Sequence, residues 1–375
     1  MSRIRLAPML ILCSSLAIVC AAGEAALSAQ ATSSPSRTAK QYRVVKIETV
    51  DADGNVGFFT SLAIDRSGRP AISYRDYTNF SLKCARWTGS SWKVETVDAS
   101  GDVGWSSSIA FDAAGNPAIS YYDGKNQALK FARWTGSTWQ TEIVDRSANV
   151  GLHTSLAFDA AGNPAISYYD DTNDDLKFAR WDPVKKRWLI QTVDSAGDVG
   201  NHTSLAFTRS GQPAISYYVG ETGDLRFARW DARQGKWHIE TVDAEGDVGL
   251  FSSLAFDAAG HPAISYFDRT HDDLKFARWN GSRWEVQTVD AEGTVGLRCS
   301  LAFDRDGRPA ISYFGNGNLR LAWWDGKRWH IQIVDATEMA GNYTSLAFDA
   351  AGNPRISYFY VTDADLRFAW LKRVK

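Results

Sequence analysis

Two histidines occupy equivalent places in a repeated pattern. His153 and His202 each stand directly before a T-S-L-A motif. A neutral imidazole accepts a proton and an imidazolium donates one, so a neighbouring pair could act as general base and general acid. The residues we expect to assist such chemistry are Arg75, Tyr122, Tyr169 and Arg298. The alternative is a pair of histidines that line a channel without catalysis. Two histidines alone make a weak metal signal, because no third ligand is evident.

A second set of residues combines tryptophan with charged groups. Six repeats carry two tryptophans on either side of a short turn. In five of them an arginine stands directly before the first tryptophan, and in four a glutamate follows the second. An indole face can stack on the C–H face of a sugar ring, while charged groups hydrogen-bond the hydroxyls. The candidate ligand-binding residues are Trp87, Trp92, Arg86, Trp134, Trp139, Arg133, Trp181, Trp188 and Arg180. The alternative is structural, with a cross-strand aromatic pair that holds the hairpin.

These candidates belong to an internal repeat that fills most of the chain. The motif PAISY begins at six prolines and returns once as PRISY. The seven prolines are Pro70, Pro117, Pro164, Pro213, Pro262, Pro309 and Pro354. The serine that opens the S-(L/I)-A motif recurs at steps of 45 to 49 residues. A period of this length is typical of a repeat architecture.

Each repeat predicts four short strands. In the third copy these are 155–159, 165–170, 176–181 and 188–194, rich in Ile, Phe, Tyr and Trp and separated by Gly, Pro, Asn and Asp. The links have hairpin length, so each repeat should form an antiparallel meander. Along the strands one face carries small residues and the other large ones, a pattern suited to sheets that stack on one another.

Seven such sheets arranged radially predict an all-β fold, a seven-bladed β-propeller over residues 43–375. The last repeat lacks the final strand that ends the other copies. A matching segment, RVVKIETVD, stands at 43–51, near the other end of the chain. We therefore expect this N-terminal strand to complete the last blade and close the ring.

The first 31 residues predict export. Arg3 and Arg5 precede an apolar run, and small residues surround a candidate cleavage site at 29–31. This pattern is typical of a secretory signal peptide, and a retained membrane anchor is the alternative. Residues 32–42 form a Ser/Thr-rich linker. We expect a secreted or periplasmic protein with no membrane contact after signal removal.

Composition excludes some partners. The net charge is −2 and no basic run stands out, so nucleic acid and anionic lipid are not indicated. Cys84 and Cys299 lie in different repeats, and a disulfide between them is not expected.

Aspartates end the fourth strand of every repeat, and they favour a structural interpretation. Asp before a turn typically caps loop amides. The alternative is a ring of calcium sites, although the spacing matches no established calcium loop. We otherwise expect no cofactor.

The blade order also predicts a ring of residues at the channel mouth. These are the residues that stand two before the Ser of the S-(L/I)-A motif: Phe59, Ser106, His153, His202, Phe251, Arg298 and Tyr343. His153 and His202 should be neighbours, because their blades are consecutive.

The D-x-x-G-x-P turn, the ISYYD strand and the W-x-G-x-x-W hairpin resemble secreted bacterial propeller repeats related to sialidase-like repeats, over residues 43–371. The sialidase Asp-box, S-x-D-x-G-x-T-W, is absent. The chain is also similar in composition to propeller lectins, which use Trp/Arg/Glu pockets between blades. Some propeller polysaccharide lyases use His, Tyr and Arg at the channel mouth.

Three functional hypotheses follow. The first is a secreted, multivalent carbohydrate-binding protein that uses the Trp and Arg residues. The second is an exported polysaccharide lyase or glycoside hydrolase that acts at the channel mouth. The third is a scaffold for a protein partner.

Overall fold

The computed structural model describes residues 42–374, which form 28 β-strands and no helix. The predicted signal peptide, residues 1–31, and all of the predicted linker except Tyr42 lie outside these residues. No helix among residues 42–374 is long and apolar enough to cross a membrane.

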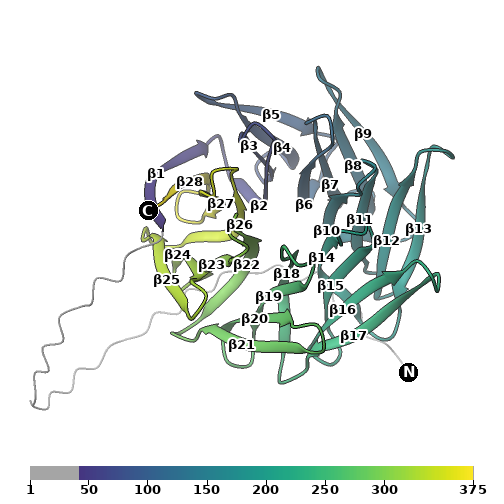
Figure 1. Ribbon diagram of the computed structural model, residues 1–375. Coiled ribbons are helices and arrows are strands. Elements are labelled where there is room, and N and C mark those ends of the chain that lie inside the picture. The colour runs from purple at the N-terminus through teal and green to yellow at the C-terminus, as the bar shows by residue number, and fades with distance from the viewer. Residues whose placement is uncertain (1–41, 375) are drawn as a thin grey trace, which may run out of the picture. The chain divides into compact units, whose positions relative to one another are not determined.

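The strands form seven four-stranded antiparallel sheets arranged around a central channel (Figure 1). This is the predicted seven-bladed β-propeller. Blades 1 to 4 contain β2 (Val56–Ile64), β3 (Pro70–Asp76), β4 (Ser81–Trp87), β5 (Trp92–Asp98), β6 (Val103–Phe111), β7 (Pro117–Asp123), β8 (Ala128–Trp134), β9 (Trp139–Asp145), β10 (Val150–Phe158), β11 (Pro164–Asp170), β12 (Asp175–Asp182), β13 (Arg187–Asp194), β14 (Val199–Phe207), β15 (Pro213–Val219), β16 (Asp224–Asp231) and β17 (Lys236–Asp243). Blades 5 to 7 contain β18 (Val248–Phe256), β19 (Pro262–Asp268), β20 (Asp273–Trp279), β21 (Trp284–Asp290), β22 (Val295–Phe303), β23 (Pro309–Gly315), β24 (Asn318–Trp324), β25 (Trp329–Asp335), β26 (Ala340–Phe348), β27 (Pro354–Tyr360), β28 (Asp365–Arg373) and β1 (Tyr42–Asp51).

The ring closes as the sequence predicts. Strand β1 pairs antiparallel with β28, with Glu48 opposite Phe368 and Tyr42 opposite Arg373. In Figure 1 the purple β1 lies beside the yellow β28. The last blade is therefore built from both ends of the repeat region, and the outer edge of β28 is covered.

The hydrophobic core lies between the blades rather than within one sheet. One cluster joins Ala165 and Phe178 of blade 3 to Leu205 and Tyr217 of blade 4. Equivalent clusters fill every other blade boundary. The small face of one sheet thus receives the large face of the next, as the alternation of residue size predicts.

Glycine allows the blades to approach closely. Gly151, at the start of β10, has a φ of 108°, and a Cβ placed there would lie 2.7 Å from the Cα of Leu129 on blade 2. A side chain at this position would separate the two blades, which explains the V-G dipeptide in blades 1 to 6.

The innermost strands are linked by a ring of hydrogen bonds. The backbone N–H of Leu156 on β10 donates to the Oγ of Ser108 on β6, at 3.0 Å. The same contact joins each innermost strand to the one before it, at all seven boundaries. The repeated serine therefore holds neighbouring blades in register.

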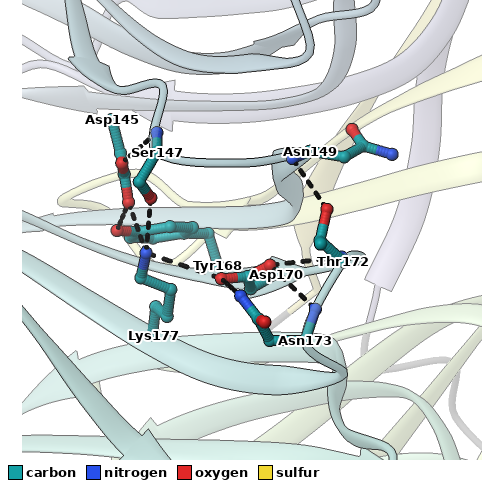
Figure 2. Close-up of polar contacts among 8 residues, drawn as sticks. All are labelled: Asp145, Ser147, Asn149, Tyr168, Asp170, Thr172, Asn173 and Lys177. Atoms are coloured by element: carbon teal, nitrogen blue, oxygen red, sulfur yellow. Dashed lines mark hydrogen bonds and ion pairs between the residues drawn. The ribbon is translucent and has the colours of Figure 1, made fainter.

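A polar cluster joins neighbouring blades near the third and fourth strands (Figure 2). The Tyr168 hydroxyl and the Lys177 ammonium of blade 3 each lie 2.7 Å from Asp145 Oδ2, at the end of blade 2. Asp145 Oδ1 accepts the N–H of Ser147 at 2.9 Å, which is the predicted cap. Burial alone would raise the pKa of Asp145, but the hydrogen bonds from Lys177 and Tyr168 outweigh it and lower the pKa.

The composition of this cluster changes in a coordinated way from blade to blade. In blades 1, 2, 3 and 5 the cation is lysine, and a second aspartate lies beside it, as Asp170 does at 3.6 Å from Lys177. In blades 4, 6 and 7 the cation is arginine, and Val219, Gly315 or Tyr360 replaces that aspartate. The lysine ammonium thus lies near two carboxylates of the cluster and the arginine guanidinium near one, although Arg367 also lies 3.7 Å from Asp363 in the preceding turn.

Both described cysteines are buried and free. Cys84 packs in the core between blades 1 and 2, at the place that phenylalanine fills in most other blades.

Candidate functional site

The seven residues predicted to ring the channel do line one cavity, of about 190 Å³. We call them the collar: Phe59, Ser106, His153, His202, Phe251, Arg298 and Tyr343. Each sits at an irregularity in the pairing of the two innermost strands and has a φ between 51° and 56°. This left-handed conformation is uncommon for residues other than glycine and asparagine, and here it accompanies side chains that line the channel.

The side chains of the collar contact one another around most of the ring. The rings of His153 and His202 lie 4.3 Å apart, which confirms that they are neighbours. His202 lies 4.5 Å from Phe251. The Arg298 guanidinium lies 4.5 Å from the Phe251 ring and 4.1 Å from the Tyr343 ring. Ser106, the smallest member, interrupts this series of contacts.

The surroundings keep both histidines neutral at pH 7. Burial chiefly lowers the pKa of His153 to about 4, and the positive charge of Arg298 adds to this effect. Burial also lowers the pKa of His202 well below its usual value, and the charges of His153 and Arg298 lower it further. The imidazoles are therefore available as proton acceptors.

The other residues proposed for chemistry at the channel do not line this cavity. Arg75 is fully buried, bonded to Asp102 at 2.6 Å and stacked 4.2 Å from the Trp105 ring. The Tyr122 hydroxyl donates to Asn149 at 2.6 Å. These side chains hold the loop that begins the next blade.

Tyr169 also lies outside the lining of the cavity and contacts the loop that begins the next blade. Its hydroxyl lies 2.8 Å from Asp174 Oδ1 and 3.0 Å from Asp198 Oδ1, and its ring lies 6.4 Å from that of His153. Of the six residues proposed for chemistry, the structure brings only His153, His202 and Arg298 together in the cavity.

The predicted Trp and Arg residues form pockets between adjacent blades. The pocket between blades 2 and 3 has a volume of about 450 Å³ and is lined by Arg133 and Glu142 of one blade and Trp181 of the next. The pocket between blades 3 and 4 has a volume of about 170 Å³ and takes Arg180 from one blade and Trp230 from the next. We call these the 2/3 and 3/4 junction pockets. Each combines an arginine with the tryptophan of the following blade.

Two further junction pockets have the same tryptophan wall. The 1/2 pocket, of about 330 Å³, includes Arg86 and Trp134. The 7/1 pocket, of about 400 Å³, includes Trp87 and Trp370. Its arginine, Arg355, comes from β27 instead and bonds Asp349 at 2.6 Å.

The second tryptophan of each hairpin has a different role. Trp188 packs edge-on against Trp181, at 5.7 Å, and against Phe131 of the preceding blade, at 5.3 Å. Trp92 packs in the same way on Trp87 and Phe368, and Trp139 on Trp134 and the core of blade 1. These residues support the wall of a pocket and do not line the pockets described above.

The arginines of the junctions differ in what they bind. Arg86 pairs with Glu95 and lies 4.0 Å above the ring of Trp134, which covers that ring. Arg278, at the 5/6 junction, pairs with Asp257. Among residues 42–374, Arg133, Arg180 and Arg229 make no hydrogen bond or ion pair, and Arg133 Nε is a buried donor without an acceptor. The arginines available to a ligand therefore lie at three consecutive junctions, 2/3, 3/4 and 4/5.

The 6/7 junction is filled by the protein itself. Trp323 occupies the arginine position, and Tyr42, fully buried at the start of β1, lies 5.7 Å from it.

Residues 42–374 contain no group of three or more His, Cys, Asp or Glu side chains that could hold a metal ion. The repeated aspartates bond tyrosine, lysine or arginine, and loop amides, as Asp145 does. The calcium interpretation stays a prediction.

Sequence reasoning missed the residues that hold the junctions together. The Tyr of PAISY and the cation of the third strand recur in every blade, and this recurrence was the available signal for the Asp145–Tyr168–Lys177 cluster. Those residues support the junction pockets, because they fix one blade against the next.

No family model matches the chain, and no curated protein matches its sequence. Solved structures do share its fold. The SapL1 lectin in complex with α-methyl fucoside has a TM-score of 0.54 and 14% identity, over 74% of this chain and 97% of that one. A polysaccharide lyase, an ulvan lyase bound to -[GlcA(1-4)Rha3S]-, has a TM-score of 0.59 and 14% identity, over 86% and 95% of the two chains.

A third structure, a protein of unknown function from Dyadobacter fermentans DSM 18053, has a TM-score of 0.57 and 11% identity. It covers 89% of this chain and 100% of that one. These likenesses establish the propeller fold.

Proposed function

We propose that this protein is a secreted carbohydrate-binding propeller that holds glycans in its junction pockets. The observation that carries the proposal is the 2/3 pocket. There, Arg133 makes no hydrogen bond or ion pair with any of residues 42–374, and Trp181 of the next blade forms the opposite wall.

The chemistry of this pocket suits a sugar. The indole of Trp181 offers an apolar face for the C–H side of a pyranose ring. Arg133 offers hydrogen-bond donors, while Glu142 and Gln140 add acceptors for the hydroxyls. The volume of about 450 Å³ lies within the range of about 300–1,000 Å³ typical of ligand pockets.

The repeat supports binding at more than one place. The 3/4 pocket repeats the Arg and Trp pair on the adjacent junction. Two weak sites on one rigid ring bind a polymer more tightly than either alone, because the second binding event is intramolecular. Export, proposed from residues 1–31, would bring such a protein into contact with polysaccharide.

A second candidate function is an exported polysaccharide lyase or glycoside hydrolase. The observation that favours it is the neutral His153–His202 pair beside Arg298 in the collar cavity. A neutral imidazole is a suitable base for proton abstraction.

One experiment separates the two candidates. The purified protein is passed over immobilised polysaccharides, and retention is measured together with new reducing ends and unsaturated products, with and without EDTA. Binding without turnover supports the lectin. Turnover that is lost when His153 and His202 are both changed to Phe supports the enzyme. Neither retention nor turnover on any polysaccharide would contradict both and favour the protein scaffold. Loss of retention in EDTA, reversed by added Ca²⁺ but not by added Mg²⁺, would establish a calcium requirement.

A further inference from the structure

Arg298 is a cation without a counter-ion. Among residues 42–374 it makes one hydrogen bond, of 3.4 Å to the Tyr343 hydroxyl, and no ion pair. Its guanidinium lies between the rings of Phe251 and Tyr343 and lines the collar cavity. Arg298 is only partly buried, and with no carboxylate beside it the guanidinium keeps most of its hydrogen-bonding capacity for a ligand.

The backbone of the collar favours a role for its side chains. All seven residues adopt a left-handed conformation that glycine, asparagine or aspartate would adopt at lower cost. None of these three residue types occurs at any of the seven positions. Bulky and charged side chains therefore stand where the backbone alone would prefer glycine, and strain of this kind concentrates at ligand sites.

The far side of the cavity is suited to the same ligand. In a ring of seven blades, Arg298 of blade 6 faces the boundary between Ser106 of blade 2 and His153 of blade 3. Ser106 makes no hydrogen bond through its side chain to any residue of the described range. A neutral His153 still carries one N–H donor. Of the described residues, no Asp or Glu lines the cavity.

We propose that the collar binds a small organic oxyanion, a carboxylate or a sulfate group, between Arg298 and the Ser106–His153 side of the channel. The planar guanidinium matches the two oxygens of such a group and gives two parallel hydrogen bonds. The flanking rings of Phe251 and Tyr343 hold the plane of the guanidinium before a ligand binds. The cavity, of about 190 Å³, has room for one such group and not for a chain of sugars. This site is separate from the junction pockets and does not depend on glycan binding there.

The test uses three probes that share one scaffold: glucuronate, glucose 6-sulfate and neutral glucose. Binding to the full protein is measured by calorimetry and by the ring signals of His153 and His202 in NMR spectra. Arg298→Gln removes the charge. Arg146→Gln removes an exposed cation elsewhere and serves as the matched control. Arg298→Tyr copies Tyr343 of blade 7 and keeps the cavity wall if Arg298→Gln fails to fold.

We expect at least one anionic probe to bind, to shift both histidine signals, and to bind at least about tenfold more weakly to both Arg298 variants. Glucose should leave these signals unchanged, and Arg146→Gln should bind as the wild type does. Comparison of the glucuronate and sulfate arms identifies the oxyanion. Wild-type protein that binds neither anion, or Arg298 variants that bind as tightly as the wild type, would overturn the proposal. Because Trp181→Ala leaves the collar intact, it should not alter this binding even where it abolishes retention on polysaccharide.

Discussion

Arg133 and Trp181 form opposite walls of one pocket, although they belong to different blades. At the preceding junction the equivalent pair is Arg86 and Trp134, and there the guanidinium lies on the indole at 4.0 Å. The two junctions have nearly the same residues, but only one leaves its arginine and its indole free. We therefore expect a junction to receive a ligand where its arginine is unpaired, and not where the arginine is already bonded to a carboxylate or lies on the indole.

Replacement of the free arginine should weaken glycan binding, and replacement of a paired one should not. Arg133→Met keeps the length of the side chain but removes its donors. We expect binding to the 2/3 pocket to weaken by about tenfold, as for the loss of a charge-assisted hydrogen bond. The control is Arg278→Met, because Arg278 already pairs with Asp257. Calorimetry measures the glycan affinity of both variants. An equal loss of affinity in the two would contradict the assignment of Arg133 to the binding site.

The stoichiometry of binding tests the same distinction. A sevenfold repeat could offer seven sites, but an unpaired arginine occurs at three junctions and the 6/7 junction is filled by Tyr42. We expect a short oligosaccharide to bind at the 2/3, 3/4 and 4/5 junctions, where the described residues leave the arginine unpaired, so calorimetry should give about three sites for each chain. A stoichiometry near seven would show that arginine pairing does not select the sites.

The cluster between blades should contribute strongly to stability. Asp145→Ala leaves Lys177 and Tyr168 of the next blade without their main acceptor, and we expect a loss of roughly 3 kcal/mol in the free energy of unfolding. Asp170→Val copies Val219 of blade 4 and should cost less, about 1–2 kcal/mol. It removes the hydrogen bonds that Asp170 accepts from Thr172 and Asn173, but Lys177 keeps Asp145. Urea denaturation compares the two. A loss in Asp145→Ala no larger than that in Asp170→Val would contradict a leading role for Asp145 at the junction.

The collar histidines should make the protein less stable in mild acid. Their pKa values are lower in the folded protein than the ordinary 6.5, to about 4 for His153. Between these pH values the unfolded chain binds more protons, so stability falls as the pH decreases from 6.5 towards 4, by roughly 1–3 kcal/mol. The variant with Phe at positions 153 and 202 copies Phe59 and Phe251. Its free energy of unfolding should fall less between pH 6.5 and 4. If the free energy of unfolding depends on pH equally in the variant and the wild type, the two imidazoles are protonated as easily in the folded protein as in water.

Closure of the ring predicts the effect of removing β1. A chain that begins after Asp51 exposes the edge of β28 and the apolar side chains of Phe368 and Leu371. We expect a lower melting temperature and association between chains through the open edge. A chain that begins at Tyr42 is the control. Equal melting and a monomeric elution profile for both would show that β1 is dispensable.

The sequence was sufficient for the architecture because periodicity acts at every blade. The alternation of Leu156 and Phe158 with Ala157 specified stacked sheets, and the segment 43–51 matched the strand missing from the last repeat. The order of the blades was enough to make His153 and His202 neighbours.

The pockets could not be predicted in the same way. Arg86 and Arg133 have nearly the same neighbours along the chain, including a glutamate nine residues later. Yet Arg86 bonds Glu95, whereas Glu142 accepts the Nε1–H of Trp188. Such choices depend on side-chain conformation across a blade boundary, which periodicity does not encode. The same limit applies to the tryptophan. The sequence analysis grouped Arg133 with Trp134 of the same hairpin, whereas the 2/3 pocket pairs Arg133 with Trp181 of the next blade.

The most direct test of glycan binding compares two tryptophan variants on a polysaccharide that retains the wild-type protein. Trp181 forms the wall of the 2/3 pocket, and Trp324 is its equivalent at the 5/6 junction, where Arg278 is paired. Each lies 5.7 Å from the second tryptophan of its hairpin, so the two substitutions by alanine disturb the fold similarly. We predict that Trp181→Ala weakens retention by about tenfold or more and that Trp324→Ala leaves it unchanged. Full retention by Trp181→Ala would contradict the proposed site.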